Sequence, residues 1–245
     1  IMNLKSTPFI SIIIPTYNEN ANILSLLSKI KKIKTEFDIN ILIIDDNSPD
    51  GTAFTVKELM NEDSFIHIIE RPSKSGLSSA YCAGFKWAIK NNYQYIIQMD
   101  ADLSHSPKDI LKFITHINEY DVIIGSRYKT GVNVVNWPLR RLILSYFANI
   151  YARIFTGLNI YDLTSGYKCI KVDSLKTINL NEIKSEGYSF QIEMNFILAN
   201  NGSKIKEVPI VFHDRTVGES KMSKKIIFEA IFKVPFFRIK KIVGK

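Results

Sequence analysis

The chain holds only two cysteines and four histidines among its 245 residues, and this scarcity excludes several kinds of site. Cys82 and Cys169 lie far apart in apolar surroundings, and no Cys-x-x-Cys motif or cysteine–histidine cluster occurs. Zinc sites and disulfide frameworks depend on such clusters. His105 and His213 form no pair with the spacing of metal ligands, so we expect each to be a hydrogen-bonded structural residue. The sequence therefore predicts reduced, buried thiols.

Apolar runs long enough to cross a membrane are also missing. The C-terminal run Ile226–Phe237 has 12 residues, whereas a membrane-spanning helix needs about 20. No basic segment followed by an apolar core opens the chain, so we expect no secretory leader and a protein on the cytosolic side. Repeats, low-complexity tracts and Gly/Ser-rich linkers are absent too. These absences predict a single domain over residues 1–245.

The net charge of +8 is concentrated at one end of the chain. Residues 221–245 contain eight lysines and arginines against the single acid Glu229, so this segment carries +7. The nearly neutral remainder argues against a nucleic-acid-binding surface spread over the fold. Because apolar residues separate the cations, we expect residues 223–245 to lie at a membrane surface as an amphipathic basic segment. A terminal helix packed on the core, with a solvated basic end, is the alternative.

Apolar runs alternate with helical patterns in the first half of the chain, which predicts an α/β fold. The apolar runs are nearly continuous, as in a mostly parallel sheet with helices on both faces. We expect residues 9–126 to form a Rossmann-like half that binds a nucleotide, and residues 127–222 to form an acceptor-binding half. Strands are expected at 9–14, 39–44, 65–69, 95–99, 122–125 and 208–212, and helices at 21–34, 52–60, 76–90, 106–118, 139–156 and 190–200.

Acidic pairs follow two of the expected strands. Asp45 and Asp46 end one apolar run, and Asp100 and Asp102 end another. Ligands of open α/β sheets bind beyond the carboxyl ends of the strands, so both pairs can face one crevice. Carboxylate oxygens suit Mg²⁺ or Mn²⁺ shared with substrate phosphates. The pairs predict a nucleotide-sugar or related nucleotide substrate, and a nicotinamide dehydrogenase is disfavoured because no Gly-x-Gly-x-x-Gly follows the first strand.

Nucleoside contacts are offered by the segment after the first expected strand. Tyr17 can stack on a base, and the carboxylates of Glu19 and Asp46 can accept hydrogen bonds from base or ribose. Ordinary turn and capping chemistry explains residues Ser48–Thr52. An isolated acid at a strand end is structural about as often as it is functional. For Asp46, a structural role and a nucleoside-binding role therefore both remain open at this point.

Several short motifs, in order along the chain, resemble the GT-A, family 2 glycosyltransferases. These motifs are Pro15-x-Tyr17-Asn18-Glu19, Asp45-Asp46-x-Ser48-Pro49-Asp50, Gly76-Leu77-Ser78, Asp100-Ala101-Asp102-Leu103-Ser104-His105 and Gly125-Ser126-Arg127-Tyr128. Later segments narrow the resemblance to dolichol-phosphate or polyprenol-phosphate mannose synthases; they are Asn136-Trp137-Pro138, Asp162-Leu163-Thr164-Ser165-Gly166 and Gly218-Glu219-Ser220-Lys221. Each motif alone is a weak match, and the order of many carries the resemblance.

This resemblance implies inverting transfer of mannose from GDP-mannose to a polyprenyl or dolichyl phosphate at the cytosolic face of a membrane. Small membrane-anchoring subunits are candidate partners. By motif, the nucleotide-sugar contacts would be Pro15, Tyr17, Glu19, Ile44, Asp46, Asp100, Ala101, Asp102, Arg215 and Lys221. Asp100, Asp102 and Ser104 would hold Mg²⁺ or Mn²⁺, although some relatives place a glutamine at the serine position. Asp102, Arg127 and Arg215 would be catalytic.

The acceptor in such a reaction is a phosphate monoester, whose second pKa is near ~6, so it is largely ionised at neutral pH. It needs a cationic pocket more than a general base, and the resemblance assigns Arg127 and Arg141 to that pocket. Arg215 and Lys221 flank a glycine-containing segment expected to close on the diphosphate; solvated surface charges are the alternative. Two functions compete with this one. The chain could transfer a sugar from another donor such as UDP-glucose, or it could be a non-catalytic binding subunit of a transferase complex.

Overall fold

The computed structural model describes residues 8–34, 37–214 and 224–243. Its centre is a seven-stranded sheet in the order β3-β2-β1-β4-β7-β5-β8. The strands are β1 (Ile10–Thr16), β2 (Ile39–Asp45), β3 (Ile66–Glu70), β4 (Tyr95–Gln98), β5 (Val122–Ser126), β7 (Lys168–Lys171) and β8 (Ile205–Pro209). All neighbours pair in parallel except β7, which runs antiparallel to both β4 and β5. The predicted mostly parallel α/β fold is confirmed.

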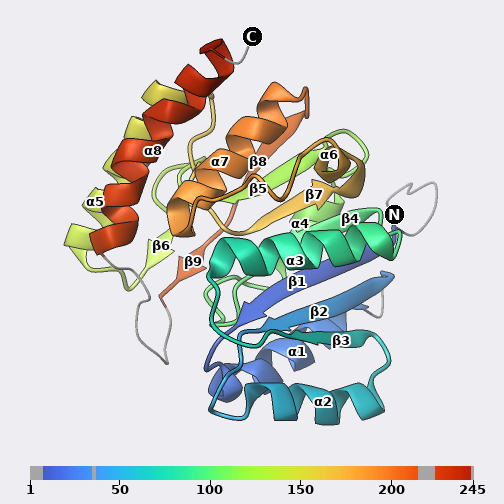
Figure 1. The fold of residues 1–245 in the computed structure, drawn as a ribbon. Helices are drawn as coiled ribbons and strands as arrows, with labels where there is room; N and C mark the ends of the chain where they lie inside the picture. The colour runs from blue at the N-terminus through green and yellow to red at the C-terminus, as the bar shows by residue number, and fades with distance from the viewer. Residues whose placement is uncertain (1–7, 35–36, 215–223, 244–245) are drawn as a thin grey trace.

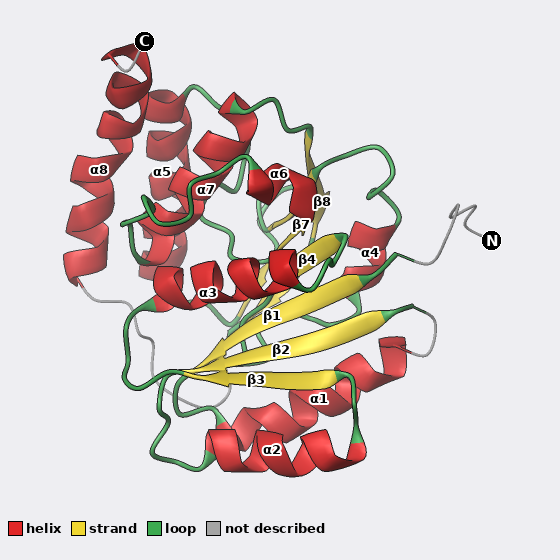
Figure 2. Ribbon diagram, turned by 45° about the vertical axis from the view of Figure 1, so that its right-hand side comes forward, coloured by secondary structure: helices red, strands yellow, loops and turns green. Residues whose placement is uncertain are grey.

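Helices cover both faces of this sheet (Figure 1). They are α1 (Asn20–Lys34), α2 (Thr52–Glu62), α3 (Leu77–Lys90), α4 (Asp109–Ile114), α5 (Leu139–Thr156), α6 (Val172–Lys176), α7 (Gly187–Asn200) and α8 (Lys224–Val243). Figure 2 shows α1 and α2 on one side of the strands and α3 on the other. A separate two-stranded parallel sheet joins β6 (Val134–Val135) to β9 (Phe212–His213).

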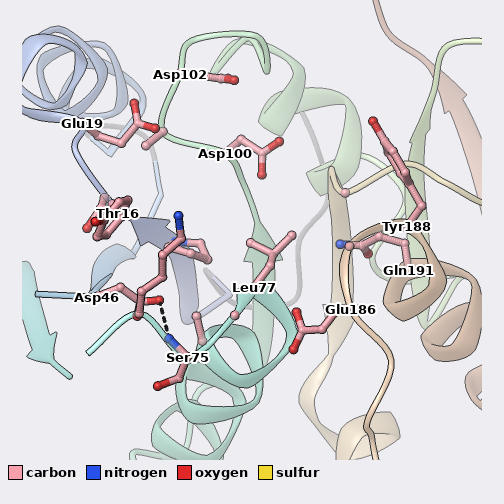
Figure 3. Close-up of a pocket in the computed structure, with 18 of the residues that line it drawn as sticks. Thr16, Glu19, Asp46, Ser75, Leu77, Asp100, Asp102, Glu186, Tyr188 and Gln191 are labelled. Atoms are coloured by element: carbon pink, nitrogen blue, oxygen red, sulfur yellow. Dashed lines mark hydrogen bonds between the residues drawn. The ribbon is translucent and has the colours of Figure 1, made fainter. Parts of the chain in front are cut away.

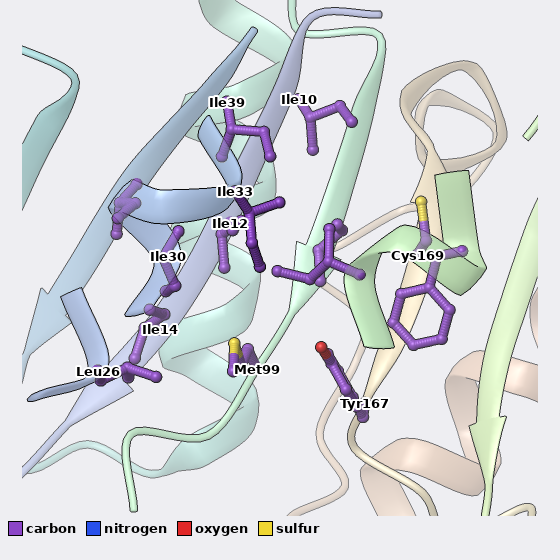
Figure 4. Packing of buried hydrophobic residues seen from close by; sticks show 14 of the residues in the cluster. Ile10, Ile12, Ile14, Leu26, Ile30, Ile33, Ile39, Met99, Tyr167 and Cys169 are labelled. Atoms are coloured by element: carbon purple, nitrogen blue, oxygen red, sulfur yellow. The ribbon is translucent and has the colours of Figure 1, made fainter. Parts of the chain in front are cut away.

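Two apolar clusters fill the space between the layers. In the first, side chains of β1 such as Ile12 pack against Leu26 and Ile30 of α1, as Figure 4 shows. In the second, Ile13 on the opposite face of β1 packs against α3, in a cluster that also contains residues of α7 and α8. Gly84 of α3 allows a close approach here, because a Cβ on it would stand 2.5 Å from Ile13. Both cysteines are free and buried, as predicted.

The structure differs from the expected elements in several places, and α6 and β6 are among the elements that were not expected. The helix expected at 106–118 is confined to Asp109–Ile114, and turns occupy the rest. The strand expected at 208–212 ends at Pro209, and residues Phe212–His213 form β9 instead. No strand was expected at β7, whose four residues include two lysines and therefore lack a continuous apolar pattern.

Helix α8 is longer than the apolar run that the sequence marks, and it contains Pro235. It lies beside α5 and α7 (Figure 1). Val234 is fully buried in the second apolar cluster, whereas Phe232 and Phe236 remain 68% and 65% exposed. The helix thus combines core packing on one side with exposed apolar side chains on another. Within the described residues, we find no helix with the length and apolarity that crossing a membrane requires.

Candidate functional site

A cavity of about 540 Å³ opens at the carboxyl ends of β1, β2 and β4. Figure 3 shows that its walls come from opposite sides of the sheet's C-terminal edge. Residues after β1 and β2 form one wall, the segment after β4 forms the floor, and the start of α7 forms the far wall. The lining residues are Pro15, Thr16, Tyr17, Glu19, Asp46, Lys74, Ser75, Gly76, Leu77, Ala80, Asp100, Ala101, Asp102, Arg141, Thr164, Gly166, Glu186, Gly187, Tyr188 and Gln191.

Most of the residues that the sequence assigns to the site meet in this pocket. They are Pro15, Tyr17, Glu19, Asp46, Asp100, Ala101, Asp102 and Arg141. Ile44 and Arg127 are absent from the lining, and the side chain of Ile44 is fully buried in the core. Ser104 stands behind Asp102 rather than in the lining. Arg215 and Lys221 lie outside the described residues.

The acidic pair after β4 is held by a tight local turn. Ser104 donates two hydrogen bonds to Asp102 Oδ1, from its backbone N–H at 3.1 Å and from its hydroxyl at 2.5 Å. Leu103 between them has φ of 64°, a left-handed conformation that costs a non-glycine residue free energy. The turn therefore fixes the carboxylate of Asp102 at the floor of the pocket. Asp100 remains more open, with 39% of its side chain exposed.

His105 binds the backbone at the start of the same turn. Its Nδ1 atom accepts a hydrogen bond from the backbone N–H of Asp100 at 3.1 Å, and its ring stacks on Tyr167 with centroids 4.6 Å apart. The side chain is 2% exposed, so this histidine is buried and hydrogen-bonded, as a structural residue is expected to be. His213 lies in β9 and is exposed.

Burial and the charge of Asp100 raise the pKa of Tyr81, whose hydroxyl lies 3.4 Å from Asp100 Oδ1 and keeps its proton.

The two acids after β2 have different surroundings. Asp45 is fully buried and accepts hydrogen bonds from the hydroxyls of Thr16 and Ser48, so it is structural. Asp46 lines the pocket, where Arg71 donates to its Oδ1 atom and the backbone N–H of Ser75 donates to Oδ2 at 3.3 Å (Figure 3). Only Asp46 of this pair therefore faces the crevice.

Arg71 was not predicted from the sequence as a site residue, although it holds this wall of the pocket together. Its guanidinium also donates to the hydroxyl of Ser79 at 2.5 Å and to the carbonyl of Gly76 at 3.0 Å. One side chain thus joins Asp46 to the loop before α3 and to the first turn of that helix. The available signal was its place two residues after the strand expected at 65–69, beside the acid that ends the neighbouring strand.

Arg127 is engaged in a buried ion pair behind the pocket. Its Nε and Nη2 atoms donate to the two carboxylate oxygens of Asp162 at 2.7 and 2.6 Å, and Nη2 also donates to Thr164 at 2.8 Å. Burial lowers the pKa of Arg127, but the charge and hydrogen bonds of Asp162 outweigh it and raise that pKa above its ordinary value. The arginine is therefore a permanent cation that fixes Thr164, a residue of the pocket wall.

Arg141 reaches the pocket from the start of α5. Its Nη1 atom donates to Asp214 at 2.7 Å, and the guanidinium lies 4.1 Å from the centroid of the Trp137 ring. Stacking and the ion pair orient the planar group, which suits bidentate recognition of an anion such as phosphate. A cation thus stands at the edge of the same pocket that holds the acidic pair.

The sequence matches the model of the family described as Glycosyl transferase family 2 over residues 11–178. This match covers both acidic strand ends and the wall residues up to Gly166. The chain belongs to this family. It is a glycosyltransferase, and most of the residues expected to contact its nucleotide sugar line the cavity described above.

Two curated relatives of this glycosyltransferase are similar along most of their length. An undecaprenyl-phosphate mannosyltransferase of Micrococcus luteus is 41% identical over 222 residues, which are 91% of this chain and 90% of the relative. A polyprenol monophosphomannose synthase of Mycolicibacterium smegmatis is 42% identical over 225 residues, which are 91% of this chain and 84% of the relative. The resemblance stated from the motifs is thus confirmed at the level of the family.

Solved structures share the fold of this glycosyltransferase at low identity. Glucosyl-3-phosphoglycerate synthase of Mycobacterium tuberculosis, in complex with Mg²⁺ and UDP, matches with a TM-score of 0.67 at 14% identity, covering 95% of this chain and 80% of that one. A mannosyltransferase of Pyrobaculum calidifontis, in complex with GDP-Man and Mn²⁺, matches with a TM-score of 0.59 at 13% identity, covering 95% and 72%. At this level of identity the likenesses show a shared fold.

The donor atoms after β4 fit a hard divalent cation. Asp100 and Asp102 supply carboxylate oxygens and Ser104 a hydroxyl, the ligand type that Mg²⁺ and Mn²⁺ prefer. Among the described residues, no group of three or more His, Cys, Asp or Glu side chains could hold a metal ion. A cation bound by the pair would therefore need further oxygens, which a substrate diphosphate and water can supply.

Proposed function

We propose that this glycosyltransferase transfers mannose from GDP-mannose to a polyprenyl phosphate, with inversion, at the cytosolic surface of a membrane. The observation that carries the proposal is the identity of 41% and 42%, over 91% of the chain, with relatives named for that product class. The pocket supports it, since an acidic pair, nucleoside contacts and an arginine line one cavity.

The donor would lie with its nucleoside against the first wall. Tyr17 offers a stacking face, and Glu19 and Asp46 offer carboxylates to base and ribose. Ile44, whose side chain is buried, can contribute only backbone atoms. The diphosphate would lie over Ala101, between the acids of the pair, where its charge needs compensation.

Asp100 and Asp102 would hold Mg²⁺ or Mn²⁺ at the diphosphate, with Ser104 keeping the carboxylate of Asp102 in place. A bound cation stabilises the charge that develops on the leaving nucleoside diphosphate. Arg215 and Lys221 are proposed to help compensate the same charge, as their motif implies. The complexes of similar folds with Mg²⁺ or Mn²⁺ support a metal of this class.

The acceptor phosphate would be received at Arg141. An oxygen of the ionised phosphate attacks C1 of the mannosyl group from the face opposite the diphosphate, and a new C1–O bond forms. The bond between C1 and the diphosphate oxygen breaks, and GDP leaves with its electron pair. No proton needs to move, because the attacking oxygen is already ionised at neutral pH. Arg127 would support the acceptor site by holding Asp162 and Thr164 in place.

Exposed apolar side chains support a membrane surface as the place of reaction. On α5 several exposed apolar side chains recur at spacings of four and seven residues, which puts them on one face of the helix. On α8 two of them are four residues apart. These side chains are Leu139, Ile143, Phe147 and Ile154 on α5, and Ile231, Phe232 and Phe236 on α8. The two helices lie side by side, joined by a hydrogen bond from the Tyr151 hydroxyl to the Ile231 carbonyl at 2.6 Å. Apolar side chains among cations suit an interfacial position.

The decisive experiment measures sugar transfer into organic-extractable polyprenyl phosphate. Radiolabelled GDP-mannose and UDP-glucose are supplied in parallel, with Mn²⁺, with Mg²⁺ and with a chelator. Metal-dependent labelling from GDP-mannose, lost in Asp102→Asn, is the expected result. Labelling only from UDP-glucose would move the enzyme to the alternative donor. Metal-dependent donor binding without any transfer would favour a non-catalytic subunit.

A further inference from the structure

The far wall of the pocket was not anticipated from the sequence. It is formed by the first turns of α7, where Glu186, Tyr188 and Gln191 face the cavity. Figure 3 shows this wall on the side of Asp100 opposite to Glu19 and Asp46. A donor that spans the pocket from the nucleoside wall, across the acidic pair, therefore ends against α7.

Gln191 is the unusual residue in that wall. Its side chain is 3% exposed, and its Oε1 atom is buried with no hydrogen-bond partner among the described residues. A buried amide oxygen without a partner is unfavourable, because it has lost its hydrogen bonds to water. The amide end points from α7 toward the pocket (Figure 3). This arrangement indicates a group that receives its partner from a ligand.

Gly166 lies between this amide and the acidic pair. A Cβ built on it would stand 3.5 Å from Gln191 Nε2 and 3.9 Å from Asp100 Oδ1. The amide and the carboxylate thus border one small space, which the glycine leaves open. Its φ is not in the left-handed region, so the backbone does not require glycine there. The absence of a side chain serves space in the pocket rather than backbone conformation.

We propose that the space between Asp100, Gly166 and Gln191 is the hexosyl subsite, and that the Gln191 amide hydrogen-bonds a hydroxyl of the transferred sugar. The proposal rests on the proposed function, in which the diphosphate lies at the acidic pair and the nucleoside at the opposite wall. The sugar follows the diphosphate, so it reaches the α7 wall. Asp100 then borders both the diphosphate and the sugar.

Such a contact gives a means of choosing among hexoses. Epimers carry the same hydroxyls in different directions, and apolar packing distinguishes them poorly. A buried amide that bonds one hydroxyl discriminates more strongly, because the wrong epimer leaves the amide unpaired. Gln191 is therefore assigned to the selection of the sugar, whereas Tyr17 and Asp46 contact the nucleoside.

The test compares sugar nucleotides with their nucleoside diphosphate. Gln191→Leu keeps the side-chain size and removes the amide, and Asn200→Leu makes the same kind of change at the exposed far end of α7. Calorimetry with Mn²⁺ measures the affinity for GDP, GDP-mannose and GDP-glucose. We expect Gln191→Leu to bind GDP within twofold of wild type, while the preference between the two sugar nucleotides falls at least tenfold. The control variant should keep that preference.

Gly166→Ala supplies an independent steric probe. Its methyl group would make ordinary van der Waals contacts, so folding is preserved, but it fills part of the subsite. GDP binding should stay within twofold, and GDP-mannose binding should weaken at least tenfold. Unchanged GDP-mannose binding in this variant would overturn the proposal. So would a Gln191→Leu enzyme that keeps its sugar preference and loses only affinity for the lipid phosphate.

Failure of the proposed function gives a different pattern. If the wild-type enzyme binds or transfers another sugar nucleotide instead, the function proposed above is wrong. The same two variants are then measured with that donor and its own nucleoside diphosphate. A subsite at Gln191 predicts loss of sugar preference with either donor, so the two outcomes remain separable.

Discussion

Arg71 holds the carboxylate of Asp46 through its Nε atom, at 2.5 Å from Oδ1. Both side chains are largely buried, at 11% and 9% exposure. The pair joins the end of β2 to the loop that precedes α3, because Arg71 also binds the carbonyl of Gly76. The carboxylate that we propose for nucleoside binding is thus already held in one orientation by the protein.

Replacing Arg71 should damage both the fold and the donor site. Arg71→Ala leaves a buried carboxylate unpaired, which should lower the free energy of unfolding by about 3 kcal/mol. Donor affinity should fall as well, because the loop carrying Ser75 and Gly76 loses its anchor. Urea titration and donor calorimetry measure the two effects. Lys57→Ala, which removes an exposed pair with Glu70, is the control and should change stability by less than about 1 kcal/mol.

Ser104 is predicted to act on metal affinity through Asp102. Ser104→Ala removes the hydroxyl hydrogen bond at 2.5 Å but keeps the backbone N–H bond at 3.1 Å. The carboxylate loses one of two restraints, so the Mn²⁺ concentration that gives half-maximal transfer should rise about tenfold. Saturating Mn²⁺ should restore most of the rate. An unrestored rate would instead place the hydroxyl among the reacting groups, and Asp102→Asn should lose activity at any Mn²⁺ concentration.

The two arginines assigned to the acceptor should separate in their effects. Arg141→Gln should raise the KM for the lipid phosphate about tenfold or more with little loss of stability, since its side chain is partly exposed beside Asp214. Arg127→Gln should destabilise the fold by about 3 kcal/mol, because Asp162 is fully buried and would lose its partner. Thermal unfolding and acceptor titration measure both. Equal stability losses in the two variants would contradict this division.

The parallel strands and the helices that alternate with them could be predicted, because buried parallel strands appear in the sequence as continuous apolar runs. β1 and β2 are such runs, and residues Ile12 and Ile43 lie fully buried in them. β7 could not be found in this way, since its place between β4 and β5 depends on contacts between distant segments. Its first residue, Lys168, is also fully buried, against the usual pattern of charged residues.

The site could be predicted where residues follow strand ends, and it was missed where distant segments converge. Asp46, Asp100 and Asp102 follow β2 and β4 and meet in the pocket as expected. Gln191 comes from a helix about ninety residues further along, and no local pattern of residues links it to Asp100. Arg127 matched a motif, yet its hydrogen bonds to Asp162 depend on the fold and not on the motif.

Lys168 should give the protein a recognisable pH dependence of stability. Burial lowers the pKa of Lys168 to about 7, although the negative charge of Asp162 acts to raise it. The Nζ atom donates a hydrogen bond to Asn195 Oδ1 at 2.9 Å. Between pH 7 and about 10.4 the unfolded chain holds a proton here that the folded chain lacks. Stability should therefore rise with pH in this window, by at most about 1.4 kcal/mol per pH unit from this residue.

Lys168→Met tests that origin. The variant removes the titrating group, so its free energy of unfolding, measured by urea titration from pH 7 to 10, should depend less on pH than that of wild type. Lys176→Met, at an exposed lysine paired with Asp173, is the matched control and should leave the slope unchanged. Parallel slopes in wild type and Lys168→Met would show that the buried lysine stays charged in the folded protein.

The exposed phenylalanines of α5 and α8 should decide membrane binding. Phe147→Ser and Phe232→Ser each remove apolar area that would enter the interface, and each should weaken binding to anionic phospholipid vesicles by about 1 kcal/mol, or about fivefold. Phe54→Ser on α2 is the matched control, because Phe54 is 66% exposed, close to the 62% and 68% of the test residues. Figure 1 places α2 far from α5 and α8. Transfer to a short, detergent-dissolved acceptor should be unaffected in all three variants, and equal vesicle binding by all three would refute a membrane-facing role for α5 and α8.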